Sequence, residues 1–375
     1  MTFADPAIPG EMPCAGARAA RVAWVDIAKG WCIILVVMMH SALGVGLALG
    51  ETGWLHAIVA FAKPFRMPDF FLVAGLFARS AINLPWRAYL DRRFVHFIYF
   101  FALWFTIVLA VKSPELGIAT PLEFVRAYAW GFVDPFSSLW FIQILPLFFL
   151  AVRLIRGVPL WVSVPFAIAL HLAAAWVPTG DIFAMSSNLT GWITFDNFAL
   201  FFVYFLVGVL ACPRIFALAR LADANRAAAI FALVIWAIAE AAAVRFGVPE
   251  IPGLTLAFGL AGACAVVALS ALLAPTGLFG WLAYCGRHSL AVYLAFTLPM
   301  GVARIVLLKT GFVTGVGWMS LLVTLCAITI PLLAERIVRG TLLAFLFKRP
   351  AWARIAGSRE NSPKQFHDNT VTRCQ

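Results

Sequence analysis

Two ionisable side chains lie on the first long apolar segment of the chain. Lys29 and His40 are eleven positions apart, and the residues between them are almost all apolar. If this segment is a helix, the spacing corresponds to roughly 16 Å along its axis. With Lys29 at one edge of a membrane core of about 30 Å, His40 is expected near the middle. An ionisable side chain at that depth costs free energy, so His40 predicts a functional site.

Arg66 and Asp69 are the corresponding groups on the second apolar segment, close to Pro64 and Pro68. Entering from the opposite side, the chain reaches Arg66 after about ten residues, or roughly 15 Å, which is the expected level of His40. Prolines remove backbone donors, and irregular backbone at this depth is tolerated only where it is buried in protein or lines a cavity. In the functional interpretation, Arg66 binds an anionic or polarised oxygen beside a histidine base.

Each of these groups also has a purely structural interpretation. Asp26 and Lys29 are three residues apart and can pair as an anchor at the membrane boundary. Arg66 and Asp69 can neutralise each other. For His40 we favour a functional role, because its desolvation must be offset by a partner. Polar residues on later segments are less specific: Gln143, His171, Asp196, Asn197 and Glu240.

The composition excludes a soluble domain. Of the 375 residues, 63% are hydrophobic and 12% charged, whereas soluble chains are about half apolar and a quarter charged. We therefore predict an all-α polytopic membrane protein. The net charge of +11 is interpreted through the positive-inside rule, and no nucleic-acid partner is expected. The seven scattered cysteines form no C-x-x-C pair and predict no metal site or disulfide framework.

A window of membrane-spanning length predicts about ten transmembrane helices. Their approximate limits are 27–49, 55–81, 93–112, 139–156, 158–177, 192–211, 226–246, 253–274, 288–309 and 313–334. The second is expected to be tilted or broken at its prolines. The longest loop on the sparsely charged side, 113–138, contains an amphipathic piece at 124–132 that can lie on the membrane surface or over a cavity.

Arginine and lysine gather in alternate loops, and ten spans place all of these loops on one side. Both termini are therefore predicted to be cytoplasmic. The predicted organisation is an N-terminal tail at 1–24, a transmembrane domain at 25–335 and a basic, polar C-terminal tail at 336–375. The end of that tail is expected to be disordered.

Five short patterns occur in a fixed order along the chain. A basic residue, ten others and a histidine occur at 29–40, with an aspartate just upstream. They are followed by Met-Pro-x-Phe-Phe-x-x-x-Gly at 67–75, Leu-Trp-Phe at 139–141, a Phe-rich stretch ending in glycine at 198–208, and Gly-x-x-Ser-Leu-x-x-Tyr at 286–293. Together they resemble the integral-membrane acyltransferase 3 family, which includes sugar O-acetyltransferases and glucan succinyltransferases. Two positions differ: Lys29 replaces a common arginine, and Phe296 replaces a frequent histidine.

The resemblance implies a ten-helix enzyme of the cell inner or plasma membrane. Such an enzyme transfers an acetyl- or succinyl-like acyl group from a cytoplasmic donor, such as acyl-CoA, to a hydroxyl of an extracytoplasmic glycan or lipid-linked sugar. His40 is the expected base or acyl relay and Arg66 the electrostatic stabiliser. Acyl-CoA is a co-substrate, and no bound cofactor is expected. The expected donor- and substrate-binding residues are Asp26, Lys29, Asp69, Trp140, Ser289 and Tyr293.

Two other functions fit the same residues. In a proton-coupled transporter or exporter of a polar solute, His40, Arg66 and Asp69 would form a proton or substrate relay. In an inactive scaffold of a cell-envelope assembly, none of them would do chemistry. The sequence carries no signature of the acyl group, the acceptor or the oligomeric state.

Overall fold

The computed structural model describes residues 22–136, 138–177 and 189–355, and every regular element in these ranges is helical. The predicted tail at 1–24, up to residue 21, and the predicted disordered end, from residue 356, lie outside the described residues. The α-helices are α1 (Ala23–Leu49), α2 (Trp54–Ala62), α3 (Arg66–Leu76), α4 (Trp86–Leu90), α5 (His96–Lys112), α6 (Pro121–Gly131), α7 (Trp140–Leu154), α8 (Leu160–Trp176), α9 (Ile193–Leu210), α10 (Cys212–Ala224), α11 (Arg226–Arg245), α12 (Leu254–Leu273), α13 (Gly280–Arg287), α14 (Ser289–Ala295), α15 (Thr297–Thr310) and α16 (Val316–Val338).

Seven helical segments are long and apolar enough to cross a membrane, and an eighth is added if the bent pair α14–α15 is one span. The apolar helix α8 has only 17 residues, and the pair α2–α3 is interrupted between its two halves. The protein is therefore a multi-pass membrane protein. The count of ten spans and the cytoplasmic termini stay predictions.

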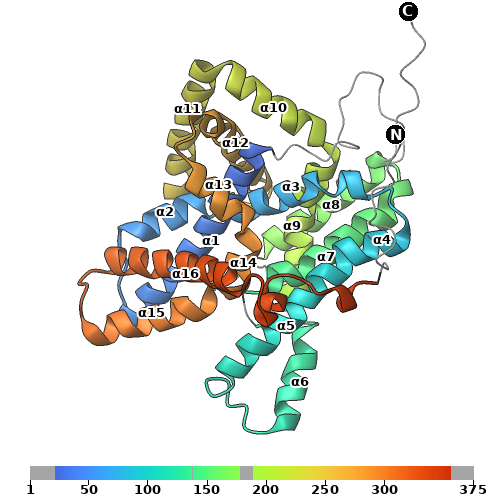
Figure 1. The fold of residues 1–375 in the computed structure, drawn as a ribbon. Coiled ribbons are helices and arrows are strands. Elements are labelled where there is room, and N and C mark those ends of the chain that lie inside the picture. The colour runs from blue at the N-terminus through green and yellow to red at the C-terminus, as the bar shows by residue number, and fades with distance from the viewer. Residues whose placement is uncertain (1–21, 137, 178–188, 356–375) are drawn as a thin grey trace, which may run out of the picture.

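Helix α1 lies at the centre of the bundle, where it contacts α2, α3, α12, α13 and α16 (Figure 1). Its contact with α13 depends on Gly286, the glycine that opens the Gly-x-x-Ser-Leu-x-x-Tyr pattern. A Cβ atom on Gly286 would overlap the backbone carbonyl of Asp26, and one on Gly30 would overlap the carbonyl of Leu282. Small residues thus let the two backbones touch, as they do in many membrane helix pairs.

The contact of α3 with α9 uses the glycines of two further patterns. A Cβ atom on Gly75 would overlap the carbonyl of Phe205, and one on Gly208 would overlap the carbonyl of Leu72. Both glycines therefore serve helix packing rather than chemistry.

An aromatic core fills the space between α3, α7 and α9. The ring of Phe71 lies 4.8 Å from Phe141, 5.0 Å from Phe148 and 5.2 Å from Phe201. Such ring pairs stabilise a fold by roughly 0.5–1.5 kcal/mol each beyond their buried area. The second phenylalanine of the Met-Pro-x-Phe-Phe pattern is thus the centre of this core.

Two of the predicted spans are broken at mid-length. The second is interrupted at residues 63–65, as its prolines predict. The ninth, predicted as one continuous helix over 288–309, is instead bent by 56° between α14 and α15. The reason is Pro299, whose ring clashes with the carbonyl of residue 295 and which has no amide to donate.

The third span begins earlier than predicted, at Trp86, and contains a π-helical turn at Asp91–Val95.

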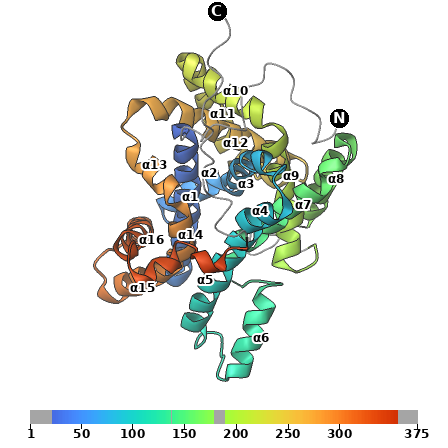
Figure 2. The same cartoon turned by 45° about the vertical axis from the view of Figure 1, so that its right-hand side comes forward.

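The predicted amphipathic piece in the loop after the third span forms α6, which stands off from the other helices beside α5 (Figure 2). The Thr120 side chain accepts from the Glu123 amide and caps α6. The amides of Ala119 and Thr120 donate to the Glu123 carboxylate, and these bonds hold the pKa of Glu123 below its usual range.

Ordered structure continues beyond residue 335. Helix α16 runs to Val338, and the segment after it crosses α5, where the Trp104 indole donates to the carbonyl of Leu346 (2.8 Å). Arg349 then forms a buried ion pair with Asp91 (2.7 Å) and also donates to the Asp91 carbonyl (2.8 Å). The segment from 342 to 355 is thus attached to the third span.

Candidate functional site

His40 lies beside both broken spans. Its imidazole is 5.4 Å, ring to ring, from Phe296, the residue at the bend between α14 and α15. Arg66 begins α3 directly after the other break, and its positive charge acts on the His40 imidazole. Its side chain is buried, with 2% exposed. We call these three residues the His40 cluster.

This placement matches a general feature of membrane proteins. Sites for polar substrates lie where helices are discontinuous, because unwound backbone exposes groups that a complete helix would satisfy. Here, an ionisable side chain on an intact helix, α1, faces two such breaks. Arg66 and His40, predicted at the same depth from opposite directions, lie on α3 and α1, which pack against each other.

Asp69 connects α3 to α1. Its Oδ2 atom accepts a hydrogen bond of 2.7 Å from the thiol of Cys32, and only 2% of the residue is exposed. Its other oxygen has no hydrogen-bond partner among the described residues. No pattern in the sequence predicts this thiol contact.

A cavity of about 210 Å³ lies at the end of the bundle where α1 begins. We call it the cation-lined cavity. It includes three predicted site residues, Lys29, Ser289 and Tyr293. The remaining lining residues are Phe70, Val73, Ala74, Phe77, Arg93, Phe97, Phe141, Ile142, Leu145, Phe149 and Leu290.

The two cations of this cavity rest on aromatic rings. Lys29 Nζ lies 4.5 Å from the centre of the Phe77 ring, and the Arg93 guanidinium lies 4.9 Å from the Phe149 ring. Arg93 also donates to the Phe77 carbonyl (2.9 Å). Cation–π contacts hold such groups in place at the cavity wall. Arg93 belongs to the π-helical turn, and such turns often occur at functional sites. From the sequence alone, Arg93 is only one of the basic residues of the alternate loops.

Tyr293 stands between the cavity and the His40 cluster. Its hydroxyl donates to the carbonyl of Ser138 and accepts from the Phe141 amide (3.2 Å), which joins α14 to the start of α7. Its ring lies 6.2 Å from Phe296, which in turn contacts His40. The cavity and the cluster are therefore separated by one layer of aromatic side chains.

Two other predicted site residues lie elsewhere. Trp140 packs in the aromatic core, with its ring 5.8 Å from Phe201, and is not among the residues that line the cavity. Asp26 is buried in the first turn of α1, under Gly286. Neither residue is among those that line the cation-lined cavity.

Of the less specific polar candidates, Gln143 and His171 join neighbouring helices to α9, and Asp196 holds the loop that leads into α9. Gln143 accepts from Thr194 (2.9 Å), and Asp196 accepts from Thr190 (2.7 Å). His171 Nδ1 lies 2.7 Å from the Leu200 carbonyl. None of the three lines the cation-lined cavity.

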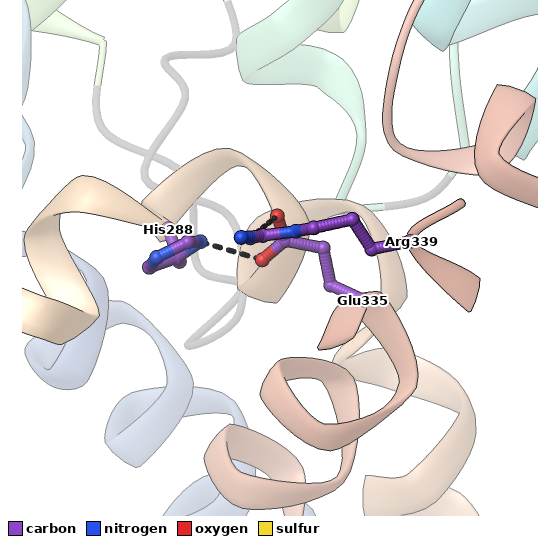
Figure 3. A network of polar contacts seen from close by, with 3 residues as sticks. All are labelled: His288, Glu335 and Arg339. Carbon is purple, nitrogen blue, oxygen red and sulfur yellow. Dashed lines mark hydrogen bonds and ion pairs between the residues drawn. The ribbon is translucent and has the colours of Figure 1, made fainter. Parts of the chain in front are cut away.

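A further polar group, not expected from the sequence, joins the start of α14 to the end of α16. His288 Nδ1 lies 2.6 Å from Glu335, whose other oxygen accepts from Arg339 at 3.0 Å (Figure 3). His288 belongs to the Gly-x-x-Ser-Leu-x-x-Tyr pattern, next to Ser289 of the cavity. The 47 positions between His288 and Glu335 leave no spacing signal that would have paired them.

Comparison with known proteins gives two matches and one negative result. Residues 22–336 match the model of a family described as an acyltransferase domain. The inner membrane protein YcfT of Escherichia coli (strain K12) is 27% identical over 180 residues, which are 42% of this chain and 50% of that protein. The match thus spans half the length of that relative. No solved structure matches the chain.

Proposed function

Since the chain belongs to the acyltransferase 3 family, we propose that it moves an acyl group, acetyl- or succinyl-like, from cytoplasmic acyl-CoA to a hydroxyl of an extracytoplasmic glycan or lipid-linked sugar. The observation that carries this proposal is the position of His40. The imidazole lies beside two broken spans, with a cation on one side and, beyond a layer of aromatic rings, a cavity of about 210 Å³ on the other.

The cation-lined cavity is the donor end in this proposal. Lys29 and Arg93 present positive charge to the phosphates of coenzyme A, as a point charge and as a planar fork respectively. The apolar and aromatic walls suit the uncharged arm of the coenzyme, which carries the thioester toward Tyr293. This assignment places the side on which α1 begins in the cytoplasm, in agreement with the positive-inside rule.

His40 supplies the base. In direct transfer, the imidazole removes the proton from the acceptor hydroxyl while the hydroxyl oxygen attacks the thioester carbonyl. The tetrahedral oxyanion that forms is stabilised by the Arg66 guanidinium. Its collapse breaks the carbon–sulfur bond, and the coenzyme A thiolate takes the proton from the imidazolium.

A covalent relay uses the same residues in two steps. The neutral imidazole attacks the thioester and expels the thiolate, which takes the proton of the other ring nitrogen. The acceptor hydroxyl then attacks the acyl-imidazole, and its proton returns to the ring as the carbon–nitrogen bond breaks. The relay does not require donor and acceptor to be present together. It therefore suits substrates that approach from opposite sides of a membrane.

The deciding experiment is acyl transfer from labelled acyl-CoA in membranes that contain His40→Ala. We expect a loss of about 10²–10⁴-fold. His56→Ala is the matched control, because His56 is a half-buried histidine at the start of α2, away from both breaks. It should retain the activity. Full transfer by a stably expressed His40→Ala protein would contradict the assigned role.

A transporter remains the second candidate, because discontinuous helices are also typical of transporters. Reconstituted vesicles separate the two functions. Solute flux without any acyl donor supports transport, whereas consumption of acyl-CoA that depends on His40 supports acyl transfer.

A further inference from the structure

The cation-lined cavity has two unlike ends. Phe77 marks one of them, because Lys29 Nζ lies over its ring (4.5 Å) and Arg93 donates to its carbonyl (2.9 Å). Phe70, which also lines the cavity, comes seven residues earlier on α3, roughly 10 Å along the helix. Both cations of the cavity are therefore at the Phe77 end, and the other end, toward the His40 cluster, is aromatic.

Three of the lining residues form this second end, which we call the aromatic end: Phe70, Phe141 and Tyr293. The rings of Phe70 and Tyr293 lie 4.5 Å and 5.4 Å from the ring of Phe141. Behind them, the fully buried ring of Phe296 lies 6.2 Å from Tyr293 and 5.4 Å from His40. A group that moves from the cavity to the imidazole has to pass between these rings.

The hydrogen-bond donors of the aromatic end are already used. The Tyr293 hydroxyl donates to a backbone carbonyl and accepts from the Phe141 amide (3.2 Å). The next amide of α7, that of Ile142, donates to the carbonyl of Leu139 (3.1 Å). Helix starts often bind anions through free amides, but these two amides have partners. Ser289 lies at the start of α14, one turn before Tyr293. A carboxylate, which only accepts hydrogen bonds, would find no partner among these donors.

The order in which acyl-CoA enters gives this polarity a consequence. With the coenzyme phosphates held by the two cations, the acyl group is the leading end of the molecule. It has to cross the aromatic end before the thioester reaches His40. A carboxylate on that acyl group would lose its water there without gaining a partner, which is costly. Arg66 cannot offset this cost, because it lies beyond the rings and faces the oxyanion in the proposed reaction.

We infer that the protein selects an uncharged, acetyl-like acyl group and rejects acyl groups that end in a carboxylate, such as succinyl. Resting on the proposed function, this selection narrows the donor to acyl-CoA with an uncharged acyl group.

The first test compares two acyl groups of equal chain length and different charge. Labelled butyryl-CoA and succinyl-CoA are supplied to membranes that contain the protein, and only the transfer that is lost in His40→Ala is counted. The kcat for butyryl should exceed that for succinyl by about 10²-fold or more. Acetyl-CoA gives the reference rate. Equal values for butyryl and succinyl, whether both are high or both are low, overturn the selection by charge.

The second test locates the step at which succinyl is rejected. Succinyl-CoA carries the same phosphates as acetyl-CoA, so it should still occupy the Phe77 end. We expect it to inhibit acetyl transfer competitively, with an inhibition constant within roughly tenfold of the acetyl-CoA KM. Absence of inhibition would place the rejection at the entrance of the cavity and overturn the role of the aromatic end.

The third test changes the layer itself. Phe296→His adds a ring N–H donor between the cavity and His40, and the ratio of succinyl to butyryl kcat should rise about tenfold. Phe296→Leu is the matched control, because it alters the ring without adding a donor and should leave the ratio unchanged. The ratio is measured within each variant, so a general loss of activity does not affect it. Equal ratios in the two variants contradict the inference, and if neither variant accumulates, the comparison of donors with the wild-type protein decides.

These outcomes separate the selection from the function on which it rests. Wild-type membranes that transfer succinyl as fast as butyryl refute the selection and leave acyl transfer standing. Wild-type membranes that transfer none of the three acyl groups refute acyl transfer itself, and the selection with it.

Discussion

The cation-lined cavity and the His40 cluster are built in opposite ways. The cavity holds space: its cations rest on aromatic rings, and about 210 Å³ between them is open. The His40 cluster is packed instead: an imidazole, a buried guanidinium and an aromatic ring lie at two helix breaks. An open, cation-bearing cavity suits the binding of part of a substrate, and a packed, irregular region suits a bond that must be made. Substitutions in the two regions should therefore change different kinetic parameters.

The largest effect is expected at Arg66. Arg66→Leu removes the positive charge that faces the oxyanion, and kcat should fall about 10²–10³-fold while the donor KM stays constant. Arg66→Lys keeps the charge and should recover part of the loss. Steady-state kinetics with labelled acyl-CoA measure both. A raised donor KM with an unchanged kcat would place Arg66 in the donor site and erase the distinction between the two regions.

A smaller and opposite effect is expected in the cation-lined cavity. Lys29→Gln and Arg93→Gln should each raise the donor KM about tenfold through lost phosphate contacts, with little change in kcat. Arg92→Gln is the control, because Arg92 is the neighbouring cation and is exposed. The test is the dependence of transfer on acyl-CoA concentration. Equal effects at positions 92 and 93 would mean that only the general surface charge matters.

Tyr293 belongs to both regions, so Tyr293→Phe should change both parameters slightly. The substitution removes hydroxyl hydrogen bonds to the start of α7 at a cost of about 1 kcal/mol. We expect a few-fold rise in donor KM together with a few-fold fall in kcat. If only one parameter changes in the kinetic assay, Tyr293 belongs to one region alone.

The smallest effect on transfer is expected from Gly208→Ala. A methyl group would overlap the carbonyl of Leu72 and should destabilise the α3–α9 contact by about 1–3 kcal/mol. The thermal unfolding temperature in detergent should fall, and the two KM values of the folded protein should stay unchanged. A selective change in one KM would show that this contact positions one of the two regions.

Much of this arrangement follows from the sequence because it depends on local rules. Apolar length predicts the membrane helices, and the prolines near Arg66 predict the first break. The fixed spacing of Lys29 and His40 predicts their separation along one helix, roughly 16 Å. The glycines of the recognised patterns have a simpler role than their association with an enzyme family implies. Gly75, Gly208 and Gly286 let helices touch.

The remainder depends on contacts between distant segments, which leave no periodic signal. The bend at Phe296 follows from Pro299, but the sequence does not show that this bend lies against His40. Arg93 becomes part of a site because a π-helical turn extends the third span back across the predicted loop boundary.

The attachment of the C-terminal segment also bears on how the chain is made. Asp91 is buried, and its partner Arg349 follows 258 residues later. At a synthesis rate of about 5–20 residues per second, that interval is on the order of tens of seconds. During this time the third span is already in the membrane, but the guanidinium that will hold its carboxylate does not yet exist. Completion of the bundle therefore waits for the last part of the chain to leave the ribosome. A chain cut short before Arg349 would leave the buried Asp91 carboxylate without its ion pair to this guanidinium.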